Sequence, residues 1–271
     1  MRCVNILLWI IHYKERSGLI TALKIVFEHN DELKPHSSLA SLFHGVLMEN
    51  IDPQYADILH TSQLHPYSQY ITGEDGCVVW NINALDKRSD EEIIGALNSV
   101  SFDKAELTGK GLSLRVLSKE GYNTSYDDLL KKHYLEERPG RYITIRFITP
   151  TAFKSAGKYV IFPTSGLILN SLVKRFDSFS GDSNISDELL FDYIERQTDI
   201  VGYDLKSAKF SLEGITIPSF IGTAKLRFSG SREFIRLMNM LMRFGEYSGT
   251  GIKTSLGMGA YKIIHTGGII E

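Results

Sequence analysis

The feature that most restricts the fold of this chain is a glycine-rich stretch near its C-terminal end. Residues 245–259 contain five glycines in fifteen positions. They lie between residues 234–244, whose apolar side chains recur at helical spacing, and residues 260–264, which are typical of a strand. A plain connection needs only about two to six residues. Because glycine accepts positive φ and has no Cβ, the stretch predicts a loop built for close backbone approach.

The residue types in this loop indicate a phosphate group as the ligand. Consecutive backbone N–H groups can cradle phosphates, and a lysine and two hydroxyls follow within the same loop. A nucleotide-binding P-loop is the rival interpretation, but it requires a contiguous Gly-Lys-Ser/Thr and then a helix. Here Ile252 separates Gly251 from Lys253, and a strand follows. The loop residues that we expect to bind a phosphate backbone are Gly249, Gly251, Lys253, Thr254, Ser255, Gly257 and Gly259.

Charge is distributed unevenly along a chain whose net charge is only −2. Residues 1–140 carry 14 Lys and Arg against 20 Asp and Glu, and residues 141–271 carry 16 against 12, which gives −6 and +4. The basic excess lies in the part that holds the glycine-rich loop. This pattern favours one electropositive face over indiscriminate affinity for nucleic acid. A solvated surface explains any single lysine equally well.

Several classes of protein are disfavoured by simple counts. The 271 residues are 43% hydrophobic and 23% charged, which is typical of a globular protein with two modest domains. The apolar run at residues 4–11 is shorter than the roughly twenty residues of a membrane span, and the charged residues 14–16 follow where a signal peptide needs small ones. Cys3 and Cys77 suit neither a disulfide framework nor a zinc site, so we expect a reducing cytoplasm and neither a metal nor another cofactor.

Two histidines border a predicted helix-turn-helix in the first half of the chain. Apolar residues recur at helical spacing over residues 39–51, Asp52-Pro53 ends that helix, and residues 55–60 predict a short second helix. His44 lies at the border of the apolar stripe, and His60 ends the second helix. Two imidazoles can serve as general base and general acid because their pKa values lie near neutrality, although a histidine beside an apolar stripe is commonly structural. The histidines that we assign to turns or the surface are His36, His65 and His133.

The order of the remaining segments predicts an α+β protein made of two ferredoxin-like units. In each half we expect strand, helix, strand, strand, helix, strand, and residues 158–162 are expected to pair with residues 141–148. The Pro139-Gly140 turn marks a domain boundary. The predicted strands are residues 23–27, 77–82, 105–108, 112–117, 141–148, 158–162, 203–212, 223–228 and 260–264, and the predicted helices are residues 37–51, 55–60, 90–97, 167–176, 186–196 and 232–244.

Basic residues outside the loop supply further candidates for phosphate contacts. Lys154 lies at a predicted hairpin tip, and Arg236 falls at helical spacing with Arg232 and Arg243. An ordinary solvated helix face accounts for the arginines equally well.

The chain also resembles a known family. Residues 251–259 are similar to the C-terminal glycine-rich signature of the sixth CRISPR-associated protein family, endoribonucleases of the RAMP superfamily that cut precursor CRISPR RNA within its repeats. The resemblance runs from about Leu23 to His265 and is strongest to members that accompany type III-A systems. Residues 1–20 fall outside the family pattern, so we predict an extension at 1–20 and ferredoxin-like domains at 21–138 and 139–271. The other segments that match, in the family's order, are Phe43–Met48, Ile58–His60, Thr149–Lys154 and Tyr159–Pro163.

The resemblance implies tandem ferredoxin-like (RRM-like) domains and metal-independent RNA cleavage by the 2′-hydroxyl, which leaves a 2′,3′-cyclic phosphate and a 5′-hydroxyl. It also places the catalytic histidine in the first helical region, which supports His44 and His60. Some archaeal members pair the histidine matching His60 with a tyrosine and a lysine, whereas this chain has Met48 at the tyrosine's place and no lysine shortly after His60. We therefore expect His44 to be the general base and His60 the general acid.

The expected partner is the CRISPR repeat transcript, with Lys154 or Lys253 stabilising the transition state and a type III effector complex receiving the product. The main alternative is a non-catalytic RNA-binding subunit of an effector complex, because related proteins with similar glycine loops act as structural components. A nucleotide-binding protein is a distant third. The first two differ over His44 and His60, which a structural subunit does not need.

Overall fold

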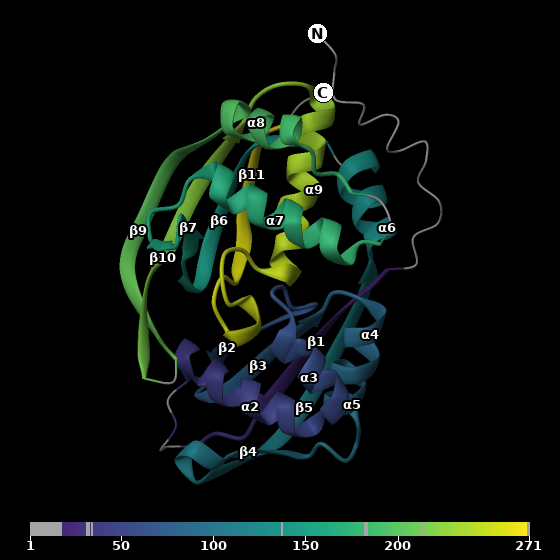
Figure 1. The fold of residues 1–271 in the computed structure, drawn as a ribbon, viewed down its shortest axis with the longest axis vertical. Helices are drawn as coiled ribbons and strands as arrows, with labels where there is room; N and C mark the ends of the chain where they lie inside the picture. Colours follow the sequence, from purple (N-terminus) through teal and green to yellow (C-terminus); the bar gives the residue numbers. More distant parts are fainter. Residues whose placement is uncertain are drawn as a thin grey trace.

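The computed structural model describes residues 18–30, 33, 35–136, 138–181, 184–212 and 214–269. Two sheets with their helices lie one above the other, and the glycine-rich loop reaches from the upper half to the lower one (Figure 1). Most of the predicted N-terminal extension, residues 1–17, lies outside the described residues. Its last two residues, Leu19 and Ile20, already belong to the first strand.

The first sheet is antiparallel throughout, with the strand order β2-β3-β1-β5-β4. Its strands are β1 (Leu19–Phe27), β2 (Tyr67–Glu74), β3 (Cys77–Ala84), β4 (Lys104–Leu107) and β5 (Leu112–Ser125). Its helical elements are η1 (Ser37–Leu39), α2 (Ala40–Asn50), α3 (Pro53–Thr61), α4 (Lys87–Ser89), η2 (Asp90–Ile94), α5 (Gly95–Asn98) and η3 (Thr108–Lys110). Phe43 of α2 packs on Trp80 of β3, with ring centroids 5.0 Å apart, and this contact holds the helical layer on the sheet.

The second sheet repeats this arrangement with the order β11-β6-β10-β9, again antiparallel. Its strands are β6 (Gly140–Thr151), β9 (Thr198–Leu212), β10 (Ile215–Phe228) and β11 (Tyr261–Ile269), and a separate hairpin is formed by β7 (Phe153–Ser155) and β8 (Lys158–Val160). Its helical elements are α6 (Tyr126–Leu129), η4 (Leu130–Glu136), α7 (Ser165–Phe179), α8 (Glu188–Gln197), α9 (Arg232–Ser248) and η5 (Thr254–Leu256). In both sheets the first strand of the unit lies between its third and its last, which confirms the predicted tandem ferredoxin-like fold.

Two strand predictions were wrong. Residues 158–162 do not pair with β6, because Ala156 and Gly157 take positive φ values of 46° and 79° and close a tight β7–β8 hairpin instead. The partners of β6 are β10 and β11. In addition, β2 was not predicted, since its Tyr67-Ser68-Gln69 start has no alternation of apolar and polar residues.

The second core draws on residues from before the predicted domain boundary. Tyr126, Leu129 and Leu130, which precede that boundary, are buried in the same cluster as Phe176 and Phe244. The Tyr126 ring meets the Phe176 ring edge-on at 5.3 Å. Side chains from α6 and η4 therefore pack against the helices of the second sheet.

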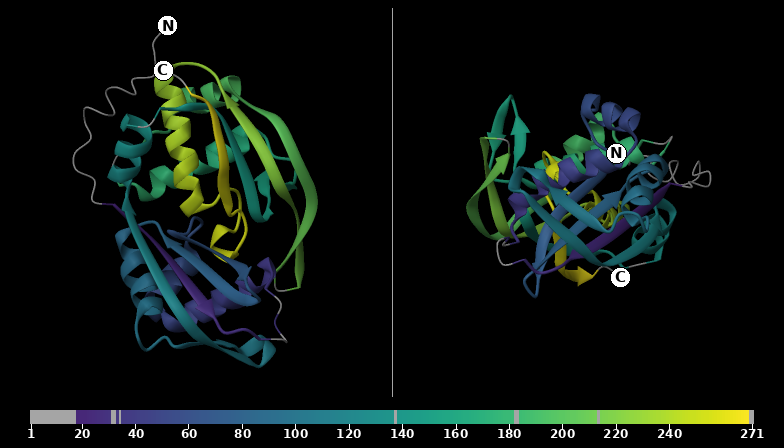
Figure 2. Two further views of the ribbon diagram at one scale, coloured as in Figure 1. Left: turned by 180° about the vertical axis from the view of Figure 1, so that it is seen from behind. Right: turned by 90° about the horizontal axis from the view of Figure 1, so that it is seen from below.

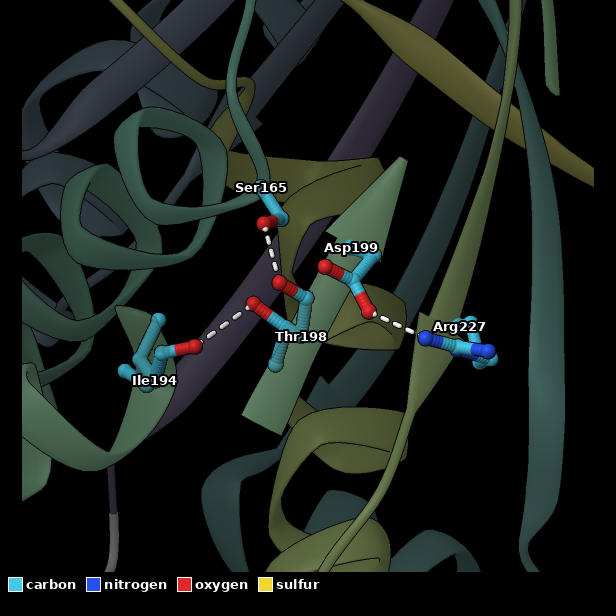
Figure 3. A network of polar contacts seen from close by, with 5 residues as sticks. All are labelled: Ser165, Ile194, Thr198, Asp199 and Arg227. Atoms are coloured by element: carbon cyan, nitrogen blue, oxygen red, sulfur yellow. Dashed lines mark hydrogen bonds and ion pairs between the residues drawn. The ribbon is translucent and has the colours of Figure 1, made fainter. Parts of the chain in front are cut away.

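A short polar network fastens α7 and α8 to the edge strand β9 (Figure 3). Ser165 Oγ donates to the Thr198 carbonyl at 2.9 Å, and Thr198 Oγ1 donates to the Ile194 carbonyl at 2.8 Å. The Arg227–Asp199 ion pair beside it is half exposed, so solvent screening makes its contribution to stability small. The two buried bonds set the position of α7, which carries residues into the site described next.

Candidate functional site

The glycine-rich loop is fastened to the first sheet by buried polar side chains of β2. Ser68 Oγ donates to the Tyr247 carbonyl at 2.5 Å, and Gln69 Nε2 donates to the Ser255 carbonyl at 2.8 Å. The Gln69 amide is itself held by Trp80, whose Nε1 donates to Gln69 Oε1 at 2.5 Å. Buried polar groups need such partners to avoid a desolvation cost. The strand that sequence patterning missed is thus the strand on which the loop rests.

The second unit holds the loop through the loop's own amides. These bonds run from Thr250 N to the Gly259 carbonyl (2.9 Å), from Gly251 N to Ser171 Oγ (2.9 Å), from Ile252 N to the Ala152 carbonyl (3.0 Å) and from Gly259 N to the Pro150 carbonyl (3.2 Å). The amides of Gly251 and Gly259 are therefore not free to bind a phosphate, and neither is that of Gly249, whose N–H donates to the Gly245 carbonyl at 2.9 Å. Thr254 and Ser255 are also buried, with 3% and 6% of their surface exposed. The glycines serve close packing within the loop.

The three basic side chains that were predicted to contact RNA differ in their exposure to solvent. Lys253 is exposed at a left-handed turn of the loop, with φ 55°, and Lys154 is exposed on β7. Arg236 is partly buried and donates to the carbonyls of Tyr134 and Leu135 at the end of η4, the latter at 2.9 Å. Its guanidinium is occupied by the chain itself, so the structure gives no support to the expected RNA contact of Arg236.

His44 lies on α2, half-buried, beside the foot of the loop. Its Nδ1 is 3.0 Å from the Tyr67 hydroxyl, and the two rings are nearly parallel with centroids 6.5 Å apart. Burial, and then the nearby His65 and His60, lower the pKa of His44 to about 4. Burial raises the pKa of Tyr67 far above its usual value, so its phenol stays protonated. His44 is therefore an uncharged imidazole at neutral pH, held by a neutral phenol.

His65 joins this cluster, contrary to its prediction as a turn or surface residue. Its ring stacks on Tyr67 with centroids 5.6 Å apart, and its Nδ1 is buried without a hydrogen-bond partner among the described residues. Burial is the main reason that the pKa of His65 is lowered, and Arg175 and His60 lower it further. The signal in the sequence was slight: His65 follows His60 by five residues, but only β2 brings its ring to Tyr67.

His60 is exposed in the last turn of α3. Because the pKa values of both His44 and His65 respond to it, the three imidazoles share one region. The structure thus brings the two predicted histidines together and adds a third. Their role in catalysis stays a prediction.

A buried arginine lies directly behind the imidazoles. Arg175 of α7 is 3% exposed, and its Nη2 is 3.4 Å from the carbonyls of His65 and Tyr67. Its Nε has no hydrogen-bond partner among the described residues, and burial lowers its pKa to about 10. Its guanidinium lies over the Phe179 ring. A cation placed here keeps positive potential on the imidazole cluster, and sequence inspection did not single it out.

Two adjoining cavities open between the first sheet and the end of α9. They have volumes of about 290 and 360 Å³ and share Tyr122 and Tyr247 in their linings. Lys262 lines the first, and Lys131 and Lys132 line the second. Glu120 also lines the first cavity and Asp128 the second, so the lysines share these linings with carboxylates. The tyrosines and lysines are the lining groups that suit a single-stranded polyanion.

We predict that His44 makes the protein acid-sensitive. Above pH 6.5 the His44 imidazole is neutral in both the folded and the unfolded chain. Between pH 6.5 and about 4 the unfolded chain binds a proton at His44, whereas the folded chain does not. The free energy of unfolding should therefore fall by about 3 kcal/mol as the pH drops through this window. Urea unfolding of His44→Gln at pH 7.5 and 4.5 should show a smaller pH effect, while the exposed His265→Gln keeps the wild-type effect. Equal losses in all three proteins would contradict the prediction.

Neither a metal-binding group nor a membrane-spanning helix occurs among the described residues. There, no three His, Cys, Asp or Glu side chains converge as ligands for a metal ion. In the same part of the chain, every helix is too short or too polar to cross a membrane.

Comparison with known proteins identifies relatives of this chain by sequence and by fold. The model of the family described as CRISPR-associated endoribonuclease Cas6 matches residues 145–261. A curated protein of that name from Streptococcus thermophilus is 32% identical over 240 residues, covering 89% of this chain and 97% of the relative. One from Mycobacterium tuberculosis (strain CDC 1551 / Oshkosh) is 30% identical over 228 residues, covering 84% and 72%. A solved Cas6 product complex matches with a TM-score of 0.76 and 23% identity over 91% of this chain and all of that one, which shows the shared fold.

Identity at this level over nearly the whole of a relative, together with the family model across the second unit, exceeds what a shared fold alone produces. This chain belongs to the family of CRISPR-associated endoribonucleases named Cas6.

Proposed function

We propose that this chain cleaves precursor CRISPR RNA within its repeats, without a metal ion, by attack of a 2′-hydroxyl on the adjacent phosphate. The observation that carries the proposal is the cluster of three histidines around Tyr67, on the strand that also holds the glycine-rich loop through Gln69. Family membership supports the RNA substrate, and imidazoles can supply the proton transfers. The products are a 2′,3′-cyclic phosphate and a 5′-hydroxyl.

The proposed reaction assigns one proton to each side of the phosphorus. His44, neutral because its pKa is lowered to about 4, accepts the 2′-hydroxyl proton as the oxygen bonds to phosphorus. The bond from phosphorus to the 5′-oxygen breaks, and His60 gives that oxygen a proton. We assign the exposed Lys253 of the loop, or Lys154 of the β7–β8 hairpin, to stabilise the charge on the phosphorane.

Binding is proposed to involve both units. The loop residues Gly249, Gly257 and their neighbours shape a surface on which Lys253 meets the RNA backbone, and the two cavities beside Tyr247 accept a further part of the strand. We propose ferredoxin-like domains at residues 21–138 and 139–271. We also propose that the product passes to a type III effector complex in the cytoplasm.

The test uses repeat RNA incubated with the purified chain in excess EDTA. We expect undiminished cleavage, and products whose 3′ ends resist ligation until the cyclic phosphate is removed. Repeat RNA with a single 2′-deoxy nucleotide at the cut site should bind as tightly but stay intact, because the nucleophile is missing. Cleavage that stops in EDTA, or that continues on the 2′-deoxy substrate, would refute the proposed chemistry.

Intact RNA in every condition would favour the alternative function, a non-catalytic RNA-binding subunit of an effector complex.

A further inference from the structure

An exposed apolar surface lies on the second unit. Its members come from β8, the segment after it and the edge strand β9. The side chains and their exposed fractions are Tyr159 (42%), Ile161 (40%), Phe162 (58%), Val201 (43%) and Tyr203 (62%). Single exposed apolar side chains are ordinary, but a contiguous group marks an interaction surface. We call these five residues the edge patch.

Two aromatic rings form the centre of the edge patch. Phe162 and Tyr203 meet edge-to-face at 88°, with centroids 5.5 Å apart, although they come from separate segments of the chain. The segment that carries Phe162 runs from the β7–β8 hairpin toward α7, past the edge strand β9 (Figure 1). Each ring therefore fixes the other while more than half of its surface stays in solvent. Such an arrangement holds two perpendicular aromatic rings in fixed positions, and each of them has a face on which one base can stack.

The charges beside the patch indicate its ligand. Lys154 is the direct cross-strand partner of Tyr159, so the two side chains share one face of the hairpin, and Lys158 is next in the chain to Tyr159. Both lysines are exposed. Flat rings flanked by lysines suit an unpaired nucleic-acid strand, whose bases stack while its phosphates meet the cations.

The patch is also joined to the loop. The hairpin follows directly after Ala152, whose carbonyl accepts the hydrogen bond from Ile252 N at 3.0 Å. A Cβ on Gly251 would lie 3.4 Å from the Phe153 ring. The hairpin and the loop are therefore in contact, and the same hairpin carries Lys154 and Tyr159 of the edge patch. Figure 2 shows from behind that the β9–β10 edge continues down beside the loop.

We propose that the edge patch is a stacking platform for an unpaired segment of the same RNA, outside the cleavage site. The proposal rests on the proposed function for the identity of the RNA. Its residues take no part in the bond-breaking steps. The platform adds affinity and selects RNA whose nucleotides near the cut are single-stranded.

The test measures binding of the uncleavable 2′-deoxy repeat RNA by fluorescence anisotropy. Phe162→Ala and Tyr203→Ala should each raise Kd by about 5- to 100-fold, the range expected for loss of one base–aromatic stack. Tyr203→Trp keeps a flat ring and should bind like the wild type. The matched control is Leu189→Ala on α8, which removes a side chain that is 66% exposed but lies outside the edge patch, and it should leave Kd unchanged.

A second measurement locates the contact. RNA carrying one 4-thiouridine at a time should crosslink to a peptide with Phe162 or Tyr203 from unpaired positions only. Unchanged Kd in both alanine variants, together with crosslinks elsewhere, would overturn the platform and leave the patch to a protein partner. Failure of the wild-type chain to bind repeat RNA would instead overturn the proposed function. Thermal unfolding of each variant, expected within a few degrees of wild type for exposed positions, shows that a change in Kd reflects lost stacking.

Discussion

His60→Ala should cut repeat RNA about 10²- to 10⁴-fold more slowly than the wild type, because that is the usual contribution of one general acid or base. His44→Ala should fall in the same range. His60 is exposed, so its removal leaves no cavity, and binding of the uncleavable RNA should be unchanged. Single-turnover cleavage at saturating enzyme measures the first quantity and anisotropy the second. This combination separates a chemical role from a binding role.

The control for these two variants is His265→Ala, which removes an exposed imidazole from β11 in the other sheet. It should cut at the wild-type rate. If His44→Ala or His60→Ala also cuts at that rate, the assignment of that histidine is wrong. His65→Ala then becomes the decisive variant, since the structure places this third imidazole against Tyr67.

Gly257→Ala is the backbone change with the largest expected effect. Gly257 has φ 103°, and a Cβ there would lie 2.2 Å from the Ala40 Cβ at the start of α2. Backbone strain and overpacking should together lower the free energy of unfolding by about 2 to 5 kcal/mol. The loop can relieve the overlap by shifting away from α2, the helix that also carries His44. We expect cleavage to fall at least about 10-fold beyond the loss in stability, measured where the variant is folded.

The structure offers a matched control and a compensating change. Gly181 has nearly the same φ, 100°, and a Cβ added there would meet nothing within 4 Å. Gly181→Ala should therefore lower the free energy of unfolding only by the backbone strain, about 1 to 3 kcal/mol. It should cleave RNA at the wild-type rate. Ala40→Gly removes the atom that Gly257→Ala meets, so the double variant should recover about 1 to 3 kcal/mol relative to additivity. A purely additive double variant would show that this contact does not position the loop.

Much of the fold was accessible from the sequence because it depends on local pattern. The amphipathic helix α9, the long alternating strands and the glycines after Ser248 each carry a signal within a dozen residues. The hairpin turn at Ala156-Gly157 shows the limit of this approach: the turn was expected, but its strands pair with each other and not with β6. Which strands pair with each other depends on which strand edges in the rest of the sheet are without a partner.

The candidate site was accessible only in part. His44 and His60 drew attention because they border the same helical pair, whereas Tyr67 and Gln69 belong to a strand with no visible period. That strand buries polar side chains. Their burial is tolerated only because the loop supplies hydrogen-bond acceptors such as the Ser255 carbonyl, which is 186 residues away from Gln69 in the chain. Pattern rules that expect buried residues to be apolar miss it for that reason.

The amino-acid sequence by itself determined the two repeated units, the close-packing loop and the presence of two histidines on the first pair of helices, since all of these follow from local spacing and residue type. The tertiary structure alone decided that His65 and Arg175 stand with His44 around Tyr67, that the loop's amides are already bonded, and that Arg236 is occupied. Burial and through-space charge set which imidazole is neutral, and both depend on neighbours that are remote in the chain.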